Sequence, residues 1–267
     1  MLWVCVSVFF KRTPQLQPLP DIPVRTSMDR EDPFPYLLTL LTSKRLILGN
    51  CDSVKLFDVV QNKVLHQLRV DSKPWSVCSL PWTRAAVALP FDNTILILDC
   101  DNQLSIVKRI AVRGKVRGVA YSNGHLIVLY SFGKIETLHM NGGIVRQTNL
   151  ETSGLFKYQP LSVMTEGNVT SIFVYDYNKG RIIRLDENLQ EQQVYPLPGV
   201  ELPWSVLAVG GNQLLVSDFD GRLWQLDSTM GRWTRLKKIY VDSMAFCHDR
   251  HVLYCGFGNI VKSYAIS

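Results

Sequence analysis

The 267-residue sequence has few charged residues and lacks the motifs that define several large protein classes. Charged residues make up 19% of the chain and hydrophobic residues 46%, a balance that excludes an intrinsically disordered chain. None of the six cysteines belongs to a C-x-x-C pair, which excludes a zinc finger, a RING or a B-box. No apolar run approaches the ~20 residues that a membrane-spanning helix needs. We therefore expect no membrane association.

Motifs of nucleotide binding and of hydrolysis are also missing. The sequence has no G-x-x-x-x-G-K-[ST], no G-x-G-x-x-G after a predicted strand, and no G-x-S-x-G. His248 and His251 are close in sequence, but they flank Asp249-Arg250 in a predicted turn without a further ligand. A loop is therefore favoured over a metal site. We expect no enzymatic activity, no metal and no cofactor.

Two acidic segments resemble calcium loops, Asp176–Asn178 and Ser217–Gly221. Each falls in a predicted hairpin, where Asp, Asn and Gly are expected for turn geometry alone, so a turn is favoured over calcium. Cys78, Cys247 and Cys255 fall in predicted strands. Buried, unreactive thiols are expected there.

The first 35 residues differ from the rest of the chain. Residues 1–10 are apolar, but Lys11 and Arg12 follow them, which is the reverse of the charge order in a secretory signal. Residues 13–35 contain six prolines, which predicts a linker or strap instead of a helix or an interior strand. Without a signal peptide, and with scattered cysteines, we predict a cytoplasmic protein despite the glycosylation sequon at Asn168. We divide the chain into an extension, residues 1–35, and a repeat domain, residues 36–267.

The repeat domain shows an internal period. Pro74-Trp75-Ser76-Val77 recurs as Pro203-Trp204-Ser205-Val206 after 129 residues, which is three units of 43. Six times, a short apolar strand precedes a turn residue, and the next strand opens two residues later on a branched aliphatic. The steps between these aliphatics are 41, 40, 47, 41 and 37 residues. The turn residues are Asp52, Asn93, Gly133, Gly180, Gly221 and Gly258, and the aliphatics are Val54, Ile95, Ile135, Ile182, Leu223 and Ile260.

Each unit contains short predicted strands and no helical period. In four units an Asp (Asp58, Asp99, Asp186 or Asp227) follows the third strand, where its carboxylate can accept hydrogen bonds from the next turn. A small sheet with two apolar faces must stack on others, and radial stacking also hides the strand edges. We therefore predict an all-β fold, a six-bladed β-propeller of four-stranded blades.

The sixth unit ends at Ser267, after its third predicted strand, so its outer strand must come from elsewhere. We predict that the N-terminal extension supplies it and closes the ring. Val24–Met28 is favoured for this role over Leu2–Phe10, which is more apolar but farther from the first unit. A WD-repeat propeller also has units of about 40 residues, but its Gly-His and Trp-Asp dipeptides are absent here.

The third strands resemble those of a known repeat family. Ser53–Asp58 (SVKLFD) and Gly221–Asp227 (GRLWQLD) are similar to NHL-type repeats, in which a turn residue, a polar residue and an aliphatic precede an aromatic or Leu and then Asp. The resemblance covers residues 36–267. This region is similar in particular to the propellers at the carboxyl end of tripartite-motif proteins. It implies a recognition module. The RING, B-boxes and coiled coil of those proteins are absent here, so the resemblance does not extend to ubiquitin-ligase activity.

The predicted starts of the first strands form the mouth of the channel. The residues there are Tyr36, Trp75, Arg117, Leu161, Trp204 and Ser243. This ring offers no carboxylate, so the alternative of a calcium-dependent lactonase lacks metal ligands. The segment Asp29–Asp32 near the first unit dilutes the positive charge expected on this face.

We predict a binding site at this mouth. Trp75, Arg117 and Trp204 form its contact centre, and the loops between units add the rim residues Lys73, Arg113 and Lys115, with Lys157 in the following loop. Aromatic rings interleaved with cations suit a protein segment. Single-stranded RNA is the alternative ligand, because bases stack and phosphates pair with cations. In the competing interpretation the two tryptophans are core residues that plug the channel.

Overall fold

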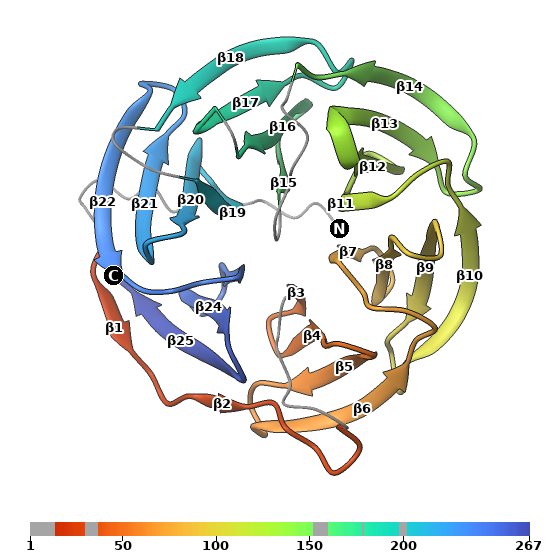
Figure 1. Cartoon of the computed structure of the whole chain (residues 1–267). Helices are drawn as coiled ribbons and strands as arrows, with labels where there is room; N and C mark the ends of the chain where they lie inside the picture. The colour runs from red at the N-terminus through yellow and green to blue at the C-terminus, as the bar shows by residue number, and fades with distance from the viewer. Residues whose placement is uncertain (1–13, 30–36, 152–159, 178, 198–201) are drawn as a thin grey trace.

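The computed structural model describes residues 14–29, 37–151, 160–177, 179–197 and 202–267. It shows six antiparallel sheets arranged in a ring, which confirms the prediction of a six-bladed β-propeller (Figure 1). In each blade the first strand lies nearest the centre and the last lies at the perimeter. No helix among the described residues is long and apolar enough to cross a membrane.

The strands follow the predicted units closely. The first strands are β3 (Leu37–Thr42), β7 (Ser76–Leu80), β11 (Val116–Ser122), β15 (Leu161–Glu166), β19 (Pro203–Gly210) and β23 (Ser243–Cys247). The second strands are β4 (Arg45–Gly49), β8 (Arg84–Leu89), β12 (His125–Tyr130), β16 (Val169–Asp176), β20 (Gln213–Asp218) and β24 (Val252–Phe257). The third strands are β5 (Ser53–Asp58), β9 (Thr94–Asp99), β13 (Lys134–His139), β17 (Arg181–Leu185), β21 (Arg222–Asp227) and β25 (Ile260–Ile266). The fourth strands of blades 1 to 5 are β6 (Lys63–Arg69), β10 (Ser105–Ala111), β14 (Ile144–Asn149), β18 (Glu191–Pro196) and β22 (Arg232–Lys238).

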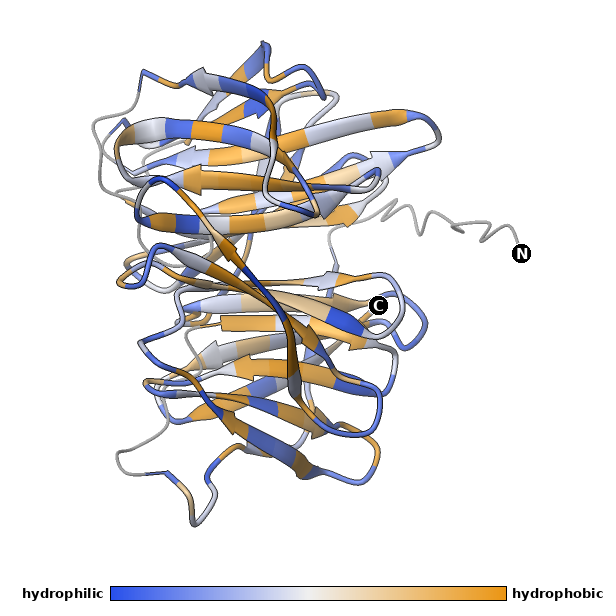
Figure 2. Cartoon of the chain, turned by 90° about the vertical axis from the view of Figure 1, so that its right-hand side faces the viewer, coloured by the Kyte–Doolittle hydropathy of each residue, from blue (hydrophilic) through white to orange (hydrophobic). Residues whose placement is uncertain are grey.

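Apolar side chains fill the spaces between neighbouring blades. Leu56 of blade 1 and Val87 of blade 2 belong to one buried cluster, and Phe57 of blade 1 and Tyr254 of blade 6 belong to another. In Figure 2 hydrophobic stretches run along the strands, while hydrophilic residues gather in the turns. Because the strand period places successive side chains on opposite faces, each sheet packs against two neighbours. The last blade therefore packs on the first, and β23 contacts β3.

The acidic residues after the third strands hold the next turn, as predicted. The Asp58 carboxylate accepts hydrogen bonds from the amides of Val60 and Gln61, both at 2.8 Å. Asp227 holds its own turn in the same way, through the amides of Thr229 and Met230 at 3.0 and 3.1 Å. Asp99 and Asp186 make equivalent contacts. The recurrence of Asp at this position therefore has a local structural cause.

The N-terminal extension closes the ring, as predicted. The closing strands are β1 (Leu16–Pro18) and β2 (Ile22–Pro23), and both pair antiparallel with β25. The predicted segment, Val24–Met28, was wrong, because these residues form a loop and a turn. The other candidate, Leu2–Phe10, lies outside the described residues.

Proline density did not prevent strand pairing here. The amides of Gln15 and Leu19 donate to the carbonyls of Ser267 and Ser263 at 3.0 and 2.9 Å, while prolines occupy positions 14, 18 and 20 between and beside them. β1 has a partner on one side only, so a proline whose nitrogen points outward removes no hydrogen bond of the ladder. The proline density, which led to the prediction of a linker, is therefore compatible with an edge strand.

The segment after β2 is tied to blade 1 by a buried ion pair. Lys55 Nζ lies 2.6 Å from Asp29 Oδ2 and donates to the Val24 carbonyl at 2.6 Å, and the Lys55 and Asp29 side chains are 1% and 0% exposed. Thr26 and Gln67 also donate to the Asp29 carboxylate, at 2.7 and 3.1 Å. Burial acts to raise the pKa of Asp29, but these hydrogen bonds and the Lys55 charge outweigh it and lower the pKa. Asp29, which was predicted to dilute a positive surface charge, therefore links the segment after β2 to Lys55 of blade 1.

Candidate functional site

Two kinds of connection meet on one face of the ring, namely the loops between blades and the turns that join second to third strands. Because consecutive strands are antiparallel, the first-to-second and third-to-fourth turns lie on the opposite face. We call the face that carries the loops between blades and the second-to-third strand turns the inter-blade loop face. The starts of the first strands, including Trp75 and Trp204, open onto it.

Trp75 is the centre of a cluster of cations. The Arg117 guanidinium carbon lies 4.6 Å from the centroid of the half-buried Trp75 ring, and Lys73 Nζ lies 5.6 Å from it. Arg117 Nε donates to Ser131 Oγ at 3.0 Å, which fixes the guanidinium over the ring. The structure thus brings together three of the residues that the sequence placed at the contact centre and its rim.

Phe91 extends this cluster into solvent. Its ring meets Trp75 edge-on at a centroid distance of 6.4 Å, and Lys115 Nζ lies 5.9 Å from its centroid. Phe91 is 59% exposed at the turn between β8 and β9. We call Trp75, Phe91, Lys73, Lys115 and Arg117 the cationic cluster. The Phe91 ring and the Lys115 ammonium are accessible to a ligand, whereas Trp75 and Arg117 are half-buried.

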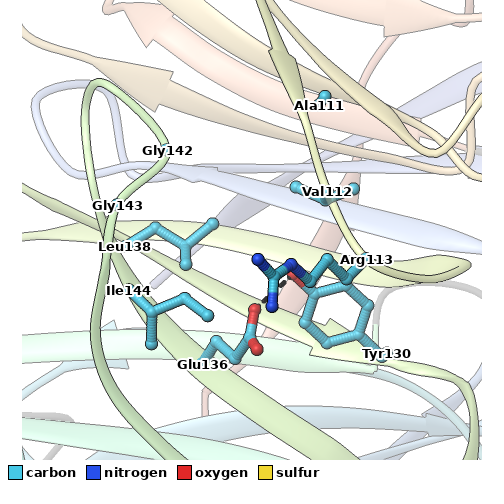
Figure 3. Close-up of a pocket in the computed structure, with 9 residues that line it drawn as sticks. All are labelled: Ala111, Val112, Arg113, Tyr130, Glu136, Leu138, Gly142, Gly143 and Ile144. Atoms are coloured by element: carbon cyan, nitrogen blue, oxygen red, sulfur yellow. Dashed lines mark hydrogen bonds between the residues drawn. The ribbon is translucent and has the colours of Figure 1, made fainter.

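Arg113 does not lie at the rim of the predicted contact centre but lines a separate pocket. It lines a pocket of about 220 Å³ between blades 2 and 3, where its side chain points toward Tyr130 and Glu136 (Figure 3). Glu136 is buried, accepts a hydrogen bond from Tyr130 Oη at 2.6 Å and pairs with Lys134 at 2.5 Å. Lys157, from the following loop, lies outside the described residues.

Trp204 does not join the cationic cluster. It lies in β19 of blade 5, and β19 is across the ring from β7, the strand that follows Trp75 (Figure 1). It lines a cleft of about 420 Å³ between blades 5 and 6. We call this the aromatic cleft, and its lining is Trp204, Asp218, Phe219, Asp220, Tyr240, Val241, Asp242 and Phe257.

Two aromatic pairs line the cleft. Trp204 and Phe219 lie 5.3 Å apart between ring centroids, and Tyr240 stacks on Phe257 at 5.5 Å. Phe219, Tyr240 and Phe257 are exposed, so their faces are accessible from solvent. The cleft therefore presents three exposed aromatic rings to a ligand.

The cleft also contains three carboxylates, of which Asp218 and Asp220 belong to the predicted acidic segment and Asp242 was missed. Asp242 accepts a hydrogen bond from Trp204 Nε1 at 2.9 Å. Burial raises the pKa of Asp242, although the hydrogen bonds from Trp204 and from the Gly258 backbone lower it in part. Ser243, the first residue of β23, was predicted to lie at the channel mouth, whereas no role was predicted for Asp242 beside it.

In the acidic loops that resembled calcium sites, the carboxylates accept hydrogen bonds from arginine side chains of the same hairpins. Asp218 accepts from Arg222 Nε at 2.7 Å and from Trp224 Nε1 at 2.9 Å, and Asp176 accepts from Arg181 Nε at 3.1 Å. Across the described ranges, no three His, Cys, Asp or Glu side chains gather closely enough to hold a metal ion. These carboxylates therefore stabilise their own hairpins.

Aromatic residues on the second-to-third strand turns were also missed. Five blades carry one within three residues before the repeat's turn residue, and the sequence alone could have revealed this recurrence. The five are Phe91, Phe132, Tyr177, Phe219 and Phe257, of which Tyr177 is half-buried and the other four are exposed. Phe132, in the 3₁₀ turn η1 (Ser131–Gly133), is 80% exposed. Four of these turns therefore expose an aromatic ring to solvent.

The cysteines of the described region differ in burial. The five that the structure describes are free thiols. Burial raises the pKa of Cys78 and of Cys100 to about 12, and it also raises that of Cys247. The expectation of buried thiols is confirmed for Cys247 and Cys255, whereas Cys78 is half-buried.

The raised pKa of Asp242 predicts a pH-dependent cost in stability. A carboxyl whose pKa is higher in the folded state destabilises the fold once it ionises, so the cost develops as the pH rises above the ordinary Asp value. Asp242→Asn is therefore expected to unfold at the same or a higher temperature than the parent at pH 7, and the difference should shrink toward pH 4. Thermal unfolding across this range checks it. A large destabilisation at pH 7 would instead make Asp242 a structural residue.

No protein-family model matches the chain, and no curated protein matches it at a significant level. The comparison thus adds no support to the NHL-type resemblance, which rests on the repeat residues alone. What is established is the six-bladed propeller and the residues of its inter-blade loop face.

Proposed function

We propose that the protein is a non-enzymatic recognition domain whose inter-blade loop face binds a segment of another protein. One observation carries this proposal: exposed aromatic side chains recur on the turns of this face, beside the two half-buried tryptophans. Aromatic and Arg residues at the centre of an interface usually supply most of its binding energy. Here Trp75 and Arg117 are in contact before any ligand arrives, so little ordering is required on binding.

A protein segment fits this face better than RNA does. The cationic cluster suits phosphates, but the aromatic cleft contains Asp220 and Asp242, which repel them. An extended peptide can offer both charges and can place apolar side chains against Phe91 and Phe219. RNA remains the alternative because the cationic cluster combines stacking surfaces with positive charge.

The finer assignments are proposals of the same kind. The NHL-type resemblance favours a recognition module similar to the propellers of tripartite-motif proteins, acting in the cytoplasm without a metal or cofactor. The lactonase alternative has little support, because Asp176 and Asp218 bind arginines. A ligase function would require domains that residues 36–267 do not contain.

Selection of a random peptide library on the purified protein tests the proposal. We expect selected peptides to bind the parent, and Phe91→Ala and Phe219→Ala each to weaken binding by about tenfold. Trp82→Ala is the matched control, because Trp82 is 85% exposed on a first-to-second strand turn of the opposite face. Equal weakening by Trp82→Ala, or no selected peptide, would contradict the proposal.

The two tryptophans require a separate test because they are half-buried. The double variant Trp75→Ala and Trp204→Ala is expected to lose peptide binding while keeping a cooperative unfolding transition. If it fails to fold, the tryptophans are core residues and the contact centre shifts to the exposed phenylalanines.

A further inference from the structure

The aromatic cleft carries an excess of negative charge. Three of its lining residues are carboxylates, and Arg222 beside them pairs with Asp218 and Asp220. Asp242 forms no ion pair in the part of the chain that the structure describes. Its one side-chain hydrogen-bond donor there is the neutral indole of Trp204.

This combination of groups matches the chemistry of cation recognition. Aromatic faces attract a cation through their quadrupole, and the attraction is larger where the cation is desolvated. The Trp204–Phe219 pair and the Tyr240–Phe257 pair supply such faces in the same cleft. The Asp242 carboxylate supplies a charged hydrogen-bond acceptor beside them.

We propose that the aromatic cleft between blades 5 and 6 binds the cationic side chain, arginine or lysine, of the recognised protein segment. The inference rests on the proposed function and names the chemistry of its ligand at one position. The cation would stack on the aromatic pairs and pair with Asp242. Burial already raises the pKa of this carboxyl, so an incoming positive charge relieves an existing cost.

A bound phosphate or nucleic-acid base would not gain these contacts. A phosphate would meet the charges of Asp220 and Asp242, and a base would leave Asp242 without a cation. A neutral apolar side chain would bury the same carboxylate without compensation, which is costly. The cleft therefore selects for positive charge over shape alone.

The indole Nε1–H of Trp204 provides a direct readout. Its NMR signal, assigned by Trp204→Phe, is followed while Nα-acetyl-arginine N-methylamide or the lysine analogue is added to the full chain. The matched neutral probe is Nα-acetyl-citrulline N-methylamide, which has the shape of arginine without its charge. We expect saturable shifts with the arginine or the lysine compound, and binding at least tenfold weaker with citrulline.

Two variants complete the test. Asp242→Asn keeps an acceptor for the Trp204 indole but removes the charge, and it is expected to weaken cation binding at least tenfold. Asp92→Asn removes an exposed carboxylate from blade 2 of the same face and should have no effect. Equal binding of citrulline and arginine, or an unchanged affinity in Asp242→Asn, would overturn the proposal.

The failure of this inference can be distinguished from the failure of the proposed function. If selected peptides bind through Phe91 but need no basic residue, the cleft assignment is wrong and the proposed function stands. If arginine binds at Trp204 but no peptide is ever selected, the cleft assignment stands and the proposed function is wrong.

Discussion

Deletion of residues 1–29 is expected to produce an aggregating chain with no cooperative unfolding transition near that of the parent. The deletion removes β1 and β2 and exposes the backbone edge of β25, and an unpaired edge strand is a template for association. It also removes Ile22 and Val24, which are buried in the cluster between blades 6 and 1. Size-exclusion chromatography and thermal unfolding measure both effects.

A milder pair of variants tests the same closure. Leu19→Pro removes the amide that donates to the Ser263 carbonyl and is expected to cost about 1–3 kcal/mol. Pro18→Ala changes a neighbouring position without removing a donor, so its effect should stay within about 0.5 kcal/mol. A deletion variant that is monomeric with the parent's melting temperature would refute closure by this segment.

Asp29→Ala is expected to destabilise the protein by about 3–5 kcal/mol, because it leaves the ammonium of Lys55 buried without its anion. Chemical denaturation measures the change. Replacing both partners, as in Asp29→Leu with Lys55→Met, should restore most of the lost stability, since it removes both buried charges. A cost of about 0.5 kcal/mol or less for Asp29→Ala would show that the ion pair does not stabilise the attachment of this segment to blade 1.

The same ion pair has a predicted pH dependence. The pKa of Asp29 is lowered in the folded state, so the stabilisation is fully present above the ordinary Asp pKa. It is lost as the pH falls through the lowered value. The stability difference between the parent and Asp29→Asn should therefore decrease in acid, and a difference that grows in acid would contradict the assignment.

The sequence was sufficient to predict the number of blades. The spacing of Val54 and its equivalents, and the Asp residues that hold the following turns, follow from local hydrogen bonding and from the strand period. The closing strand was not predictable in the same way. An edge strand needs donors on one side only, so it tolerates the prolines around Gln15 and Leu19, which are typical of a linker and not of an interior strand.

The candidate site was predicted in part. Trp75 and Arg117 begin first strands of adjacent blades, so their contact follows from the repeat register. Trp204 lies three repeats from Trp75, and in a ring of six this places it on the opposite side. The carboxylate of Asp242 was missed because side-chain direction at the end of a loop depends on packing, here on the indole of Trp204.

The salt dependence of binding tests the proposed function most directly. The affinity of the parent for a selected peptide and for a random-sequence single-stranded RNA is measured from 50 to 500 mM salt. We predict that the peptide binds across this range and loses affinity in Phe91→Ala. RNA should bind only at low salt, with log–log slopes of about −0.7 per phosphate neutralised. Tight RNA binding at 500 mM salt that Phe91→Ala abolishes, with no peptide bound, would contradict the account.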